Sequence, residues 1–135
     1  LQDDDLPINK LNGAIGNWER AQGSALMEEW LLEYNNIDLV ISNNDDMALG
    51  AIDAINRANN IKGIKIVGID GTKEALDAIN EGKLLGTIES DKKEYARAII
   101  ELAMSEIEKT ELPKDISEKL TDNKSYNVSQ IPKVK

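Results

Sequence analysis

The sequence predicts an α/β fold in which a parallel sheet is flanked by helices in three layers. Segments rich in branched apolar residues alternate with amphipathic segments of helical spacing, and this alternation is typical of βα units. The predicted core strands are residues 37–42, 64–70 and 84–88. A weak internal repeat agrees with two βα units of similar design, because residues 48–56 resemble residues 75–80 and each follows a predicted strand.

The composition is that of a globular domain and excludes several kinds of chemistry. The chain has 135 residues and a net charge of −9, with 25 acidic against 16 basic residues, which disfavours nucleic acid and anionic membranes as partners. It contains no Cys and no His, so thiol nucleophiles, imidazole bases and zinc sites built on these residues are excluded. We also expect no bilayer-spanning segment and no signal peptide in this chain.

The first half is expected to contain one loose strand and two helices. Residues 8–14 alternate weakly and are predicted as a strand, after which Asn17 is placed to cap a helix over residues 18–34. A second helix is predicted over residues 47–58, and the polar cluster at residues 43–46 precedes it. The apolar face of the first helix is expected to include Ala21, Ala25, Met27, Trp30 and Leu31.

The second half is expected to contain two more helices and a polar end. A helix is predicted over residues 72–81. Asp91 is placed to cap a long helix, with Glu94 as the reciprocal partner in a capping box. The apolar stripe of that long helix is expected to contain Ala96, Ile99, Ile100, Ala103 and Ile107. Short extended pieces are predicted in the polar end, near residues 116–120 and 126–131.

Polar and aromatic residues follow the predicted strands directly. Asn44, Asp70 and Ser90 come after the three core strands, and Trp18 comes after residues 8–14. Ligands of parallel sheets bind beyond the carboxyl ends of the strands. A carboxylate accepts hydrogen bonds from hydroxyl groups, an Asn amide both donates and accepts, and an indole face packs against the C–H face of a pyranose. This set suits a neutral polyol, whereas a phosphate-binding loop is missing from the sequence.

Structural roles remain open at the same residues. Asn44 can cap the following helix, since Asn and Asp are favoured at N-caps, and Asp70 can be a turn residue. Trp18, at the start of a predicted helix, can be a packing residue. The adjacent acids Asp45 and Asp46 could suggest metal binding or acid–base chemistry, but the side chains of neighbouring residues rarely converge on one atom. The residues alone do not decide between these alternatives.

At these positions the sequence resembles the glucose/galactose-binding periplasmic proteins, a branch of the ribose-binding type of sugar receptor. The resemblance covers nearly the whole chain, and its motifs are specific in combination. It implies the C-terminal half of a two-lobed ABC-importer receptor that binds a monosaccharide such as galactose or glucose and is not an enzyme. The matching segments are residues 17–22 (NWERAQ), 38–51 (DLVISNNDDMALGA), 66–76 (IVGIDGTKEAL), 82–88 (GKLLGTI) and 122–124 (DNK).

The resemblance also implies roles for individual residues. Asn44 and Asp70 match the residues that hydrogen-bond sugar hydroxyls, and Trp18 matches the aromatic residue that stacks on the sugar ring. Ser90 stands where the glucose/galactose receptors have an Asn that contacts the sugar, which leaves the identity of the sugar open. Asp38 stands where the family has an acidic ligand of a structural calcium, whose other ligands would lie upstream of this chain. No other cofactor is implied.

The same resemblance implies a division of the chain. Residues 1–90 would be part of the C-terminal sugar-binding lobe, and residues 91–135 would cross the hinge, supply a helix of the other lobe and return. Such a fragment would leave the apolar stripe of that helix and one sheet edge uncovered, so we expect pairing with the missing half or self-association. The expected further partner is an ABC permease, and the expected location is the periplasm or, for a Gram-positive lipoprotein, the outer cell surface.

Two other functions share this fold. The effector-binding domain of a lactose-repressor-type transcription regulator would follow a basic helix-turn-helix, and the pattern of Trp18, Asn44 and Asp70 favours the receptor instead. A small flavodoxin-like signalling or enzyme domain would need a phosphoacceptor Asp or a phosphate loop early in the chain. Asp70 imitates the former, but the helix after it lacks the expected lysine placement.

Overall fold

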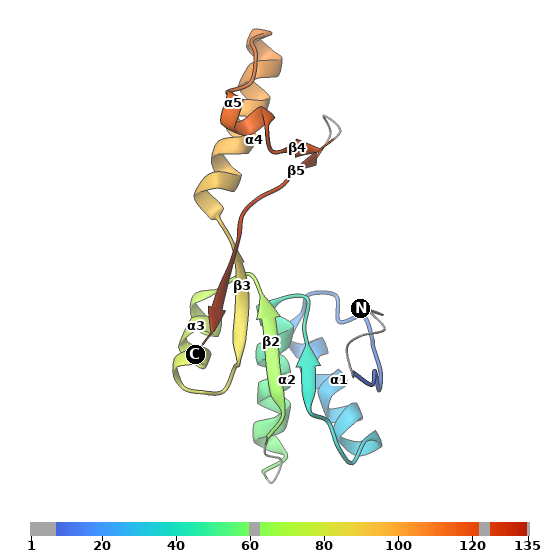
Figure 1. Ribbon diagram of the computed structural model, residues 1–135. Helices are drawn as coiled ribbons and strands as arrows, with labels where there is room; N and C mark the ends of the chain where they lie inside the picture. Colours follow the sequence, from blue (N-terminus) through green and yellow to red (C-terminus); the bar gives the residue numbers. More distant parts are fainter. Residues whose placement is uncertain (1–7, 60–62, 122–124, 135) are drawn as a thin grey trace.

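Strands and helices alternate along the chain as predicted, in a computed structural model that describes residues 8–59, 63–121 and 125–134 (Figure 1). The elements are α1 (Arg20–Glu33), β1 (Leu39–Ile41), α2 (Asp45–Arg57), β2 (Lys65–Ile69), α3 (Lys73–Asn80), β3 (Gly86–Ser90), α4 (Lys92–Glu108), α5 (Lys114–Ser117), β4 (Leu120–Thr121), β5 (Ser125–Tyr126) and β6 (Gln130–Val134). The matching segment at residues 122–124 lies outside the described residues.

The main sheet has the strand order β1-β2-β3-β6. The first three strands are parallel, with Val40 opposite Ile66 and Ile69 opposite Ile88, which confirms the predicted parallel sheet. Strand β6 adds an antiparallel neighbour to β3. Within the described residues β1 pairs with β2 alone, so it forms the edge of the sheet.

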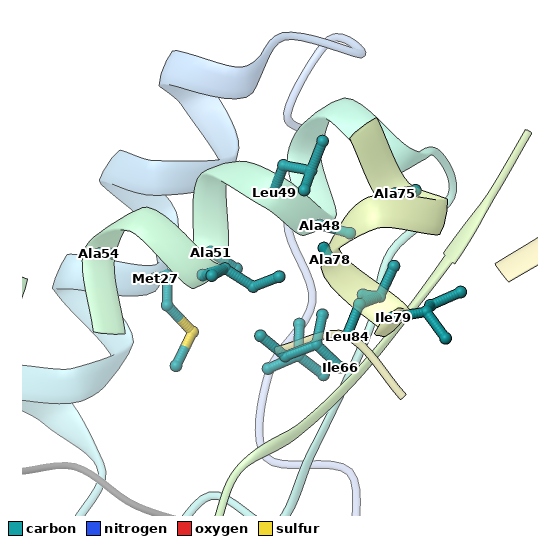
Figure 2. Packing of buried hydrophobic residues seen from close by; sticks show 12 residues of the cluster. Met27, Ala48, Leu49, Ala51, Ala54, Ile66, Ala75, Ala78, Ile79 and Leu84 are labelled. Carbon is teal, nitrogen blue, oxygen red and sulfur yellow. The ribbon is translucent and has the colours of Figure 1, made fainter. Parts of the chain in front are cut away.

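Helices cover one face of this sheet (Figure 1). Val40 and Ile66 point into a core shared with α2 and α3, and α1 adds Met27 to that core (Figure 2). Each buried aliphatic side chain of this kind stabilises the fold by about 1.5–3 kcal/mol. On the opposite face Leu39 and Ile41 remain exposed, with 42% and 53% of their surface open. The described part therefore contains the sheet and one of the two flanking layers, which agrees with an incomplete α/β lobe.

Helices α1 and α2 approach each other so closely that their backbones touch. A Cβ atom at Gly50 would lie 2.1 Å from the carbonyl oxygen of Arg20, so only glycine fits there. On the α1 side Gly23 is buried at this contact, whereas Ala21 and Ala25 are exposed. The prediction that these two alanines belong to the buried face is wrong, because the close crossing selects the residue with the smallest side chain.

The start of the described chain differs from the sequence-based expectation. Residues 8–14 form no strand, and no described strand lies beside them to supply hydrogen bonds. Asn17 does not cap α1, because Asn17 and Trp18 adopt left-handed backbone angles, with φ of 51° and 60°. The amide of Glu19 donates to the carbonyl of Gly16 at 3.0 Å, and this turn delays the helix start to Arg20.

Beyond β3 the chain leaves the sheet. Helices α4 and α5 and the β4–β5 pair stand apart from it, and the chain returns through β6 (Figure 1). Asp91 caps α4 as predicted, by accepting hydrogen bonds from the amides of Lys93 and Glu94 at 3.0 Å each. No helix within the described ranges is both long enough and apolar enough to cross a membrane.

The predicted capping box at this helix is wrong. The amide of Asp91 donates to the carbonyl of Ser129 and not to Glu94. The Glu94 carboxylate is drawn to the returning segment, where it accepts from the amide of Ser129 at 3.1 Å and from the hydroxyl of Tyr126 at 3.0 Å, and pairs with Lys119. Lys119 first, and then Ser129, hold the pKa of Glu94 down to about 2.

The predicted apolar stripe of α4 is exposed, as expected for an uncovered helix. Ile100 and Ile107 have 62% and 75% of their surface open, whereas Ala98 is buried. The remaining residues of the stripe, Ala96, Ile99 and Ala103, are exposed as well. The extended piece predicted near residues 116–120 begins instead with α5, in which the amide of Ile116 donates to the carbonyl of Pro113.

Candidate ligand-binding site

The carboxyl ends of β1, β2 and β3 meet at one edge of the sheet. The ladder continues past the strands, since the amide of Ser42 donates to Val67 at 3.0 Å and the amide of Asp70 donates to Ile88 at 2.8 Å. The predicted residues Asn44, Asp70 and Ser90 therefore follow neighbouring strand ends at the same edge, where parallel sheets bind ligands.

Asn44 has a double structural role at this edge. Its Oδ1 accepts from the amide of Met47 at 2.9 Å, which caps α2. Its Nδ2 donates to the carbonyl of Trp18 at 3.1 Å, which ties the loop before α1 to the end of β1. The capping alternative is thus confirmed. A primary amide has a second N–H and a second lone pair, so Asn44 keeps one donor and one acceptor for a ligand, although only 6% of its surface is open.

Trp18 is presented on the surface. Its exposed fraction is 67%, so it is not a core packing residue. The indole lies on the loop whose carbonyl Asn44 binds. An exposed aromatic ring beside polar groups provides an apolar platform with a polar rim. This arrangement is available for the stacking role that the sequence predicts.

Asp70 is the exposed residue that directly follows β2. Its backbone has a φ of 122°, and Gly71 after it has a φ of 65°, so the chain turns sharply into α3, which Thr72 caps. Loss of water around the carboxyl group raises the pKa of Asp70, and the negative charge of Asp45 adds to the rise; Lys92 opposes it. A carboxyl group in a turn with a perturbed pKa is typical of functional sites and of structural turns alike.

Ser90 lies at the end of β3, beside the returning strand β6. Its Oγ lies 3.1 Å from Nε2 of Gln130, its partner in the antiparallel register. Gln130 thus brings a side-chain amide to the same edge. Gln130 was not predicted as a site residue from the sequence, because only the pairing of β6 with β3 places it beside Ser90.

Two buried polar residues beneath the edge were also not assigned from the sequence. Asp45 is fully buried, and its carboxylate accepts from the amide of Thr72 at 2.7 Å and from Oγ1 of Thr87 at 2.6 Å. Asp46 beside it is exposed, so the two acids do not converge. Within the described residues no buried polar side-chain atom lacks a hydrogen-bond partner.

Asp38 does not assemble a calcium site with the residues that the structure describes. Its carboxylate lies 3.4 Å from Nδ2 of Asn36, which is a donor and not a ligand. The described ranges contain no cluster of three or more acidic side chains that fits a metal ion. Since calcium takes six to eight oxygen ligands, Asp38 on its own does not fit this ion.

Two surface hollows lie elsewhere on the molecule. One, of about 250 Å³, lies between α4, α5 and β5, and the other, of about 530 Å³, lies along α1 and α2. Neither is lined by Trp18, Asn44, Asp70 or Ser90. The candidate residues lie instead at the carboxyl edge of the sheet, which suits one wall of a cleft.

A sheet with three parallel strands, helices on one face and polar residues at its carboxyl edge defines the class of protein as one with an α/β lobe. Comparison with known families agrees: residues 5–111 match the family described as periplasmic binding protein domain. The chain belongs to this family, which confirms the resemblance seen in the sequence.

Named relatives support the same placement. The chain is 38% identical over 90 residues to the D-galactose/methyl-galactoside binding periplasmic protein of Haemophilus influenzae. The aligned residues make up 65% of this chain and 27% of that protein. A periplasmic solute binding protein of an ABC transporter from Actinobacillus succinogenes, solved with D-allose, has a TM-score of 0.73 at 28% identity and covers 88% of this chain and 39% of that one.

A third relative is a solute binding protein of an ABC transporter from Bacillus halodurans, solved with myo-inositol. It is 44% identical with a TM-score of 0.51, over 53% of this chain and 25% of that one. The chain thus spans between a quarter and two fifths of the length of these relatives. All three are named as binding proteins.

Proposed function

We propose that this chain forms part of the sugar-binding lobe of an ABC-importer receptor. The observation that carries the proposal is the meeting of Asn44, Asp70 and Ser90 at one carboxyl edge, in a chain of the periplasmic binding protein family. The relatives are named for, or were solved with, a galactoside, D-allose and myo-inositol, which are all neutral molecules with several hydroxyl groups.

Each residue has a definite part in the proposed contact. The Asp70 carboxylate accepts hydrogen bonds from adjacent sugar hydroxyls, and Asn44 adds its free N–H and lone pair. The exposed indole of Trp18 packs against the C–H face of the ring, and Ser90 with Gln130 lines the far end of the edge. Among monosaccharides we propose galactose or glucose, since the Haemophilus relative is named for galactose.

The chain is proposed to supply one wall of a two-walled site. Residues 1–90 would belong to the sugar-binding lobe, and residues 91–135 would cross a hinge, add a helix to a second lobe and return as β6. Figure 1 supports this division, because α4 and α5 stand apart from the sheet. Closing of the two lobes on the sugar is a ligand-driven population shift.

The proposed partners follow from this division. The uncovered stripe of α4 and the free edge of β1 would be covered by the remainder of a receptor or, without it, by a second copy of the chain. The closed receptor would deliver the sugar to an ABC permease, in the periplasm or on the outer cell surface. A calcium ion at Asp38 is proposed only together with further oxygen ligands beyond those described.

The test is calorimetry of the 135-residue chain against galactose, glucose, ribose and myo-inositol. We expect dissociation constants on the order of millimolar, since one wall makes only part of the contacts. Asp70→Asn should abolish the heat of binding, whereas Asp77→Asn should not, because Asp77 lies on α3 away from the strand ends and its ion pair among the described residues is with Lys73. Equal binding by both variants, or no heat with any of the four ligands, would contradict the proposal.

A further inference from the structure

We propose that Asp45 and Thr87 are positioning residues that fix the loop bearing Asp70 in the shape required to bind sugar. The inference deepens the proposed function and rests on it, because Asp70 is the residue proposed to accept hydrogen bonds from the ligand. Neither Asp45 nor Thr87 reaches the surface, since their exposed fractions are 0% and 2%. Both act through the loop and not by touching the ligand.

The hydrogen bonds converge on the two amides that follow Asp70. The carboxylate of Asp45 accepts from the amide of Thr72 at 2.7 Å through Oδ2, and from Oγ1 of Thr87 at 2.6 Å through Oδ1. The same Oγ1 of Thr87 accepts from the amide of Gly71 at 3.2 Å. Both amides next to Asp70 are thereby connected to one buried carboxylate, one of them directly and the other through a hydroxyl group.

This network connects all three parallel strands. Asp45 follows β1 and begins α2, Thr87 lies within β3, and the loop of Asp70 follows β2. Strand β2 also makes room for the carboxylate, because a Cβ atom at Gly68 would lie 2.4 Å from Oδ1 of Asp45. Any larger residue at Gly68 would displace the carboxylate from its two donors.

A buried carboxylate needs a reason to be present, because taking it out of water is costly unless its oxygens are hydrogen-bonded. Among the described ion pairs none involves Asp45, so its donors are the amide and the hydroxyl alone. An apolar residue would fill the same core position without that cost. The gain from the carboxylate is therefore the fixed geometry of the loop that it binds.

The backbone of the loop requires such support. Asp70 has a φ of 122°, a value that L-residues rarely adopt, and Gly71 has a φ of 65°. Conformations of this kind persist only where surrounding contacts enforce them. The hydrogen bonds on the amides of Gly71 and Thr72 supply that enforcement directly after the strained residue.

The charges around Asp70 offer a second readout. Loss of water around the carboxyl group is the largest cause of the raised pKa of Asp70. The negative charges of Asp45 and Asp46 of α2 raise this pKa further, and Lys92 at the start of α4 lowers it. Glu89 of β3 also lies beside the loop, next to Gly71. Replacing Asp45 by Asn removes one negative charge, so the pKa of Asp70 should fall and sugar binding should persist to a lower pH.

The primary test compares Thr87→Val with Thr87→Ser. The valine variant keeps the shape but removes the hydroxyl group, and the serine variant restores the hydroxyl. We expect galactose or glucose binding to weaken about tenfold in Thr87→Val and to stay within about twofold of the parent in Thr87→Ser. Hydrogen exchange at the amide of Gly71 should accelerate in the valine variant alone, and this measurement needs no sugar.

The outcomes separate the inference from the proposed function. Parent-like binding and Gly71 exchange in Thr87→Val would overturn the positioning role while the receptor proposal stands. A parent chain that binds none of the sugars would overturn the receptor proposal, and the positioning of Asp70 for sugar with it. If Thr87→Val fails to fold, Asp45→Asn decides through the bond to Thr72: weaker sugar binding with faster hydrogen exchange at the amide of Thr72 supports the inference, and parent-like binding and exchange overturn it.

Discussion

The two hydrogen bonds of Asn44 can be separated by substitution. Oδ1 caps α2 through the amide of Met47, and Nδ2 donates to the carbonyl of Trp18. Asn44→Ala removes both bonds. Asn44→Ser keeps a capping oxygen but lacks the donor to the Trp18 carbonyl. The pair of variants therefore isolates the link between the Trp18 loop and the end of β1.

The structure sets the size of each effect. Loss of an N-cap side chain costs about 1 kcal/mol, and loss of an intramolecular hydrogen bond costs about 1 kcal/mol. Because Asn44 is almost fully buried, neither loss is fully replaced by water. Asn44→Ala should therefore cost about 2 kcal/mol. Asn44→Ser should cost about 1 kcal/mol, since serine is a favoured N-cap and only the bond to the Trp18 carbonyl is lost.

Urea unfolding followed by tryptophan fluorescence measures both values. The slope of the unfolding free energy against urea concentration, compared between variant and parent, checks two-state behaviour. The two variants should share the slope of the parent and differ from each other by about 1 kcal/mol in unfolding free energy. If Asn44→Ser is as destabilising as Asn44→Ala, then the cap contributes nothing and the role assigned to Asn44 is wrong.

Further predictions concern packing, pH and association. Gly50→Ala forces a Cβ atom into the backbone of α1 and should lower the free energy of unfolding by about 2–3 kcal/mol, measured by thermal unfolding. Gly13→Ala is the control, because its Cβ atom would meet a flexible lysine side chain, and it should lower the free energy of unfolding by less than about 0.5 kcal/mol. Because the pKa of Glu94 is lowered, its carboxylate contributes stability that is present above pH 4.5 and is lost as the pH falls toward 2. In Glu94→Gln the unfolding free energy should therefore depend less on pH in that window. Parent and variant curves that coincide would refute this. The chain should self-associate in light scattering through its exposed apolar surfaces, and Ile100→Glu should reduce the mass; a monomeric parent would contradict that expectation.

Most of the fold was predictable from local patterns. The runs of branched apolar residues at β1 and β2, and the cap residues Asn44 and Asp91, carry their signals within a few positions of sequence. The failures came where a distant segment decides the outcome. The face that α1 buries is set by its contact with Gly50, and the partner of Glu94 is the returning segment at Ser129.

The candidate site shows the same division. The expected parallel sheet predicted that Asn44, Asp70 and Ser90 would lie at the same edge, because the carboxyl ends of parallel strands point in one direction. Gln130 and Thr87 were not found, since a glutamine in an irregular end and a threonine within a strand are common. Only the pairing of β6 with β3 and the burial of Asp45 give these two residues a role.

The most direct test of the central claim is to map where the sugar binds. Amide chemical shifts of the labelled chain would be followed during titration with galactose and glucose. The account predicts that shifts gather at residues 43–45, 70–72 and 89–91, with the indole N–H of Trp18 among them. Shifts gathered instead along α1 and α2, or none at saturating sugar, would contradict it.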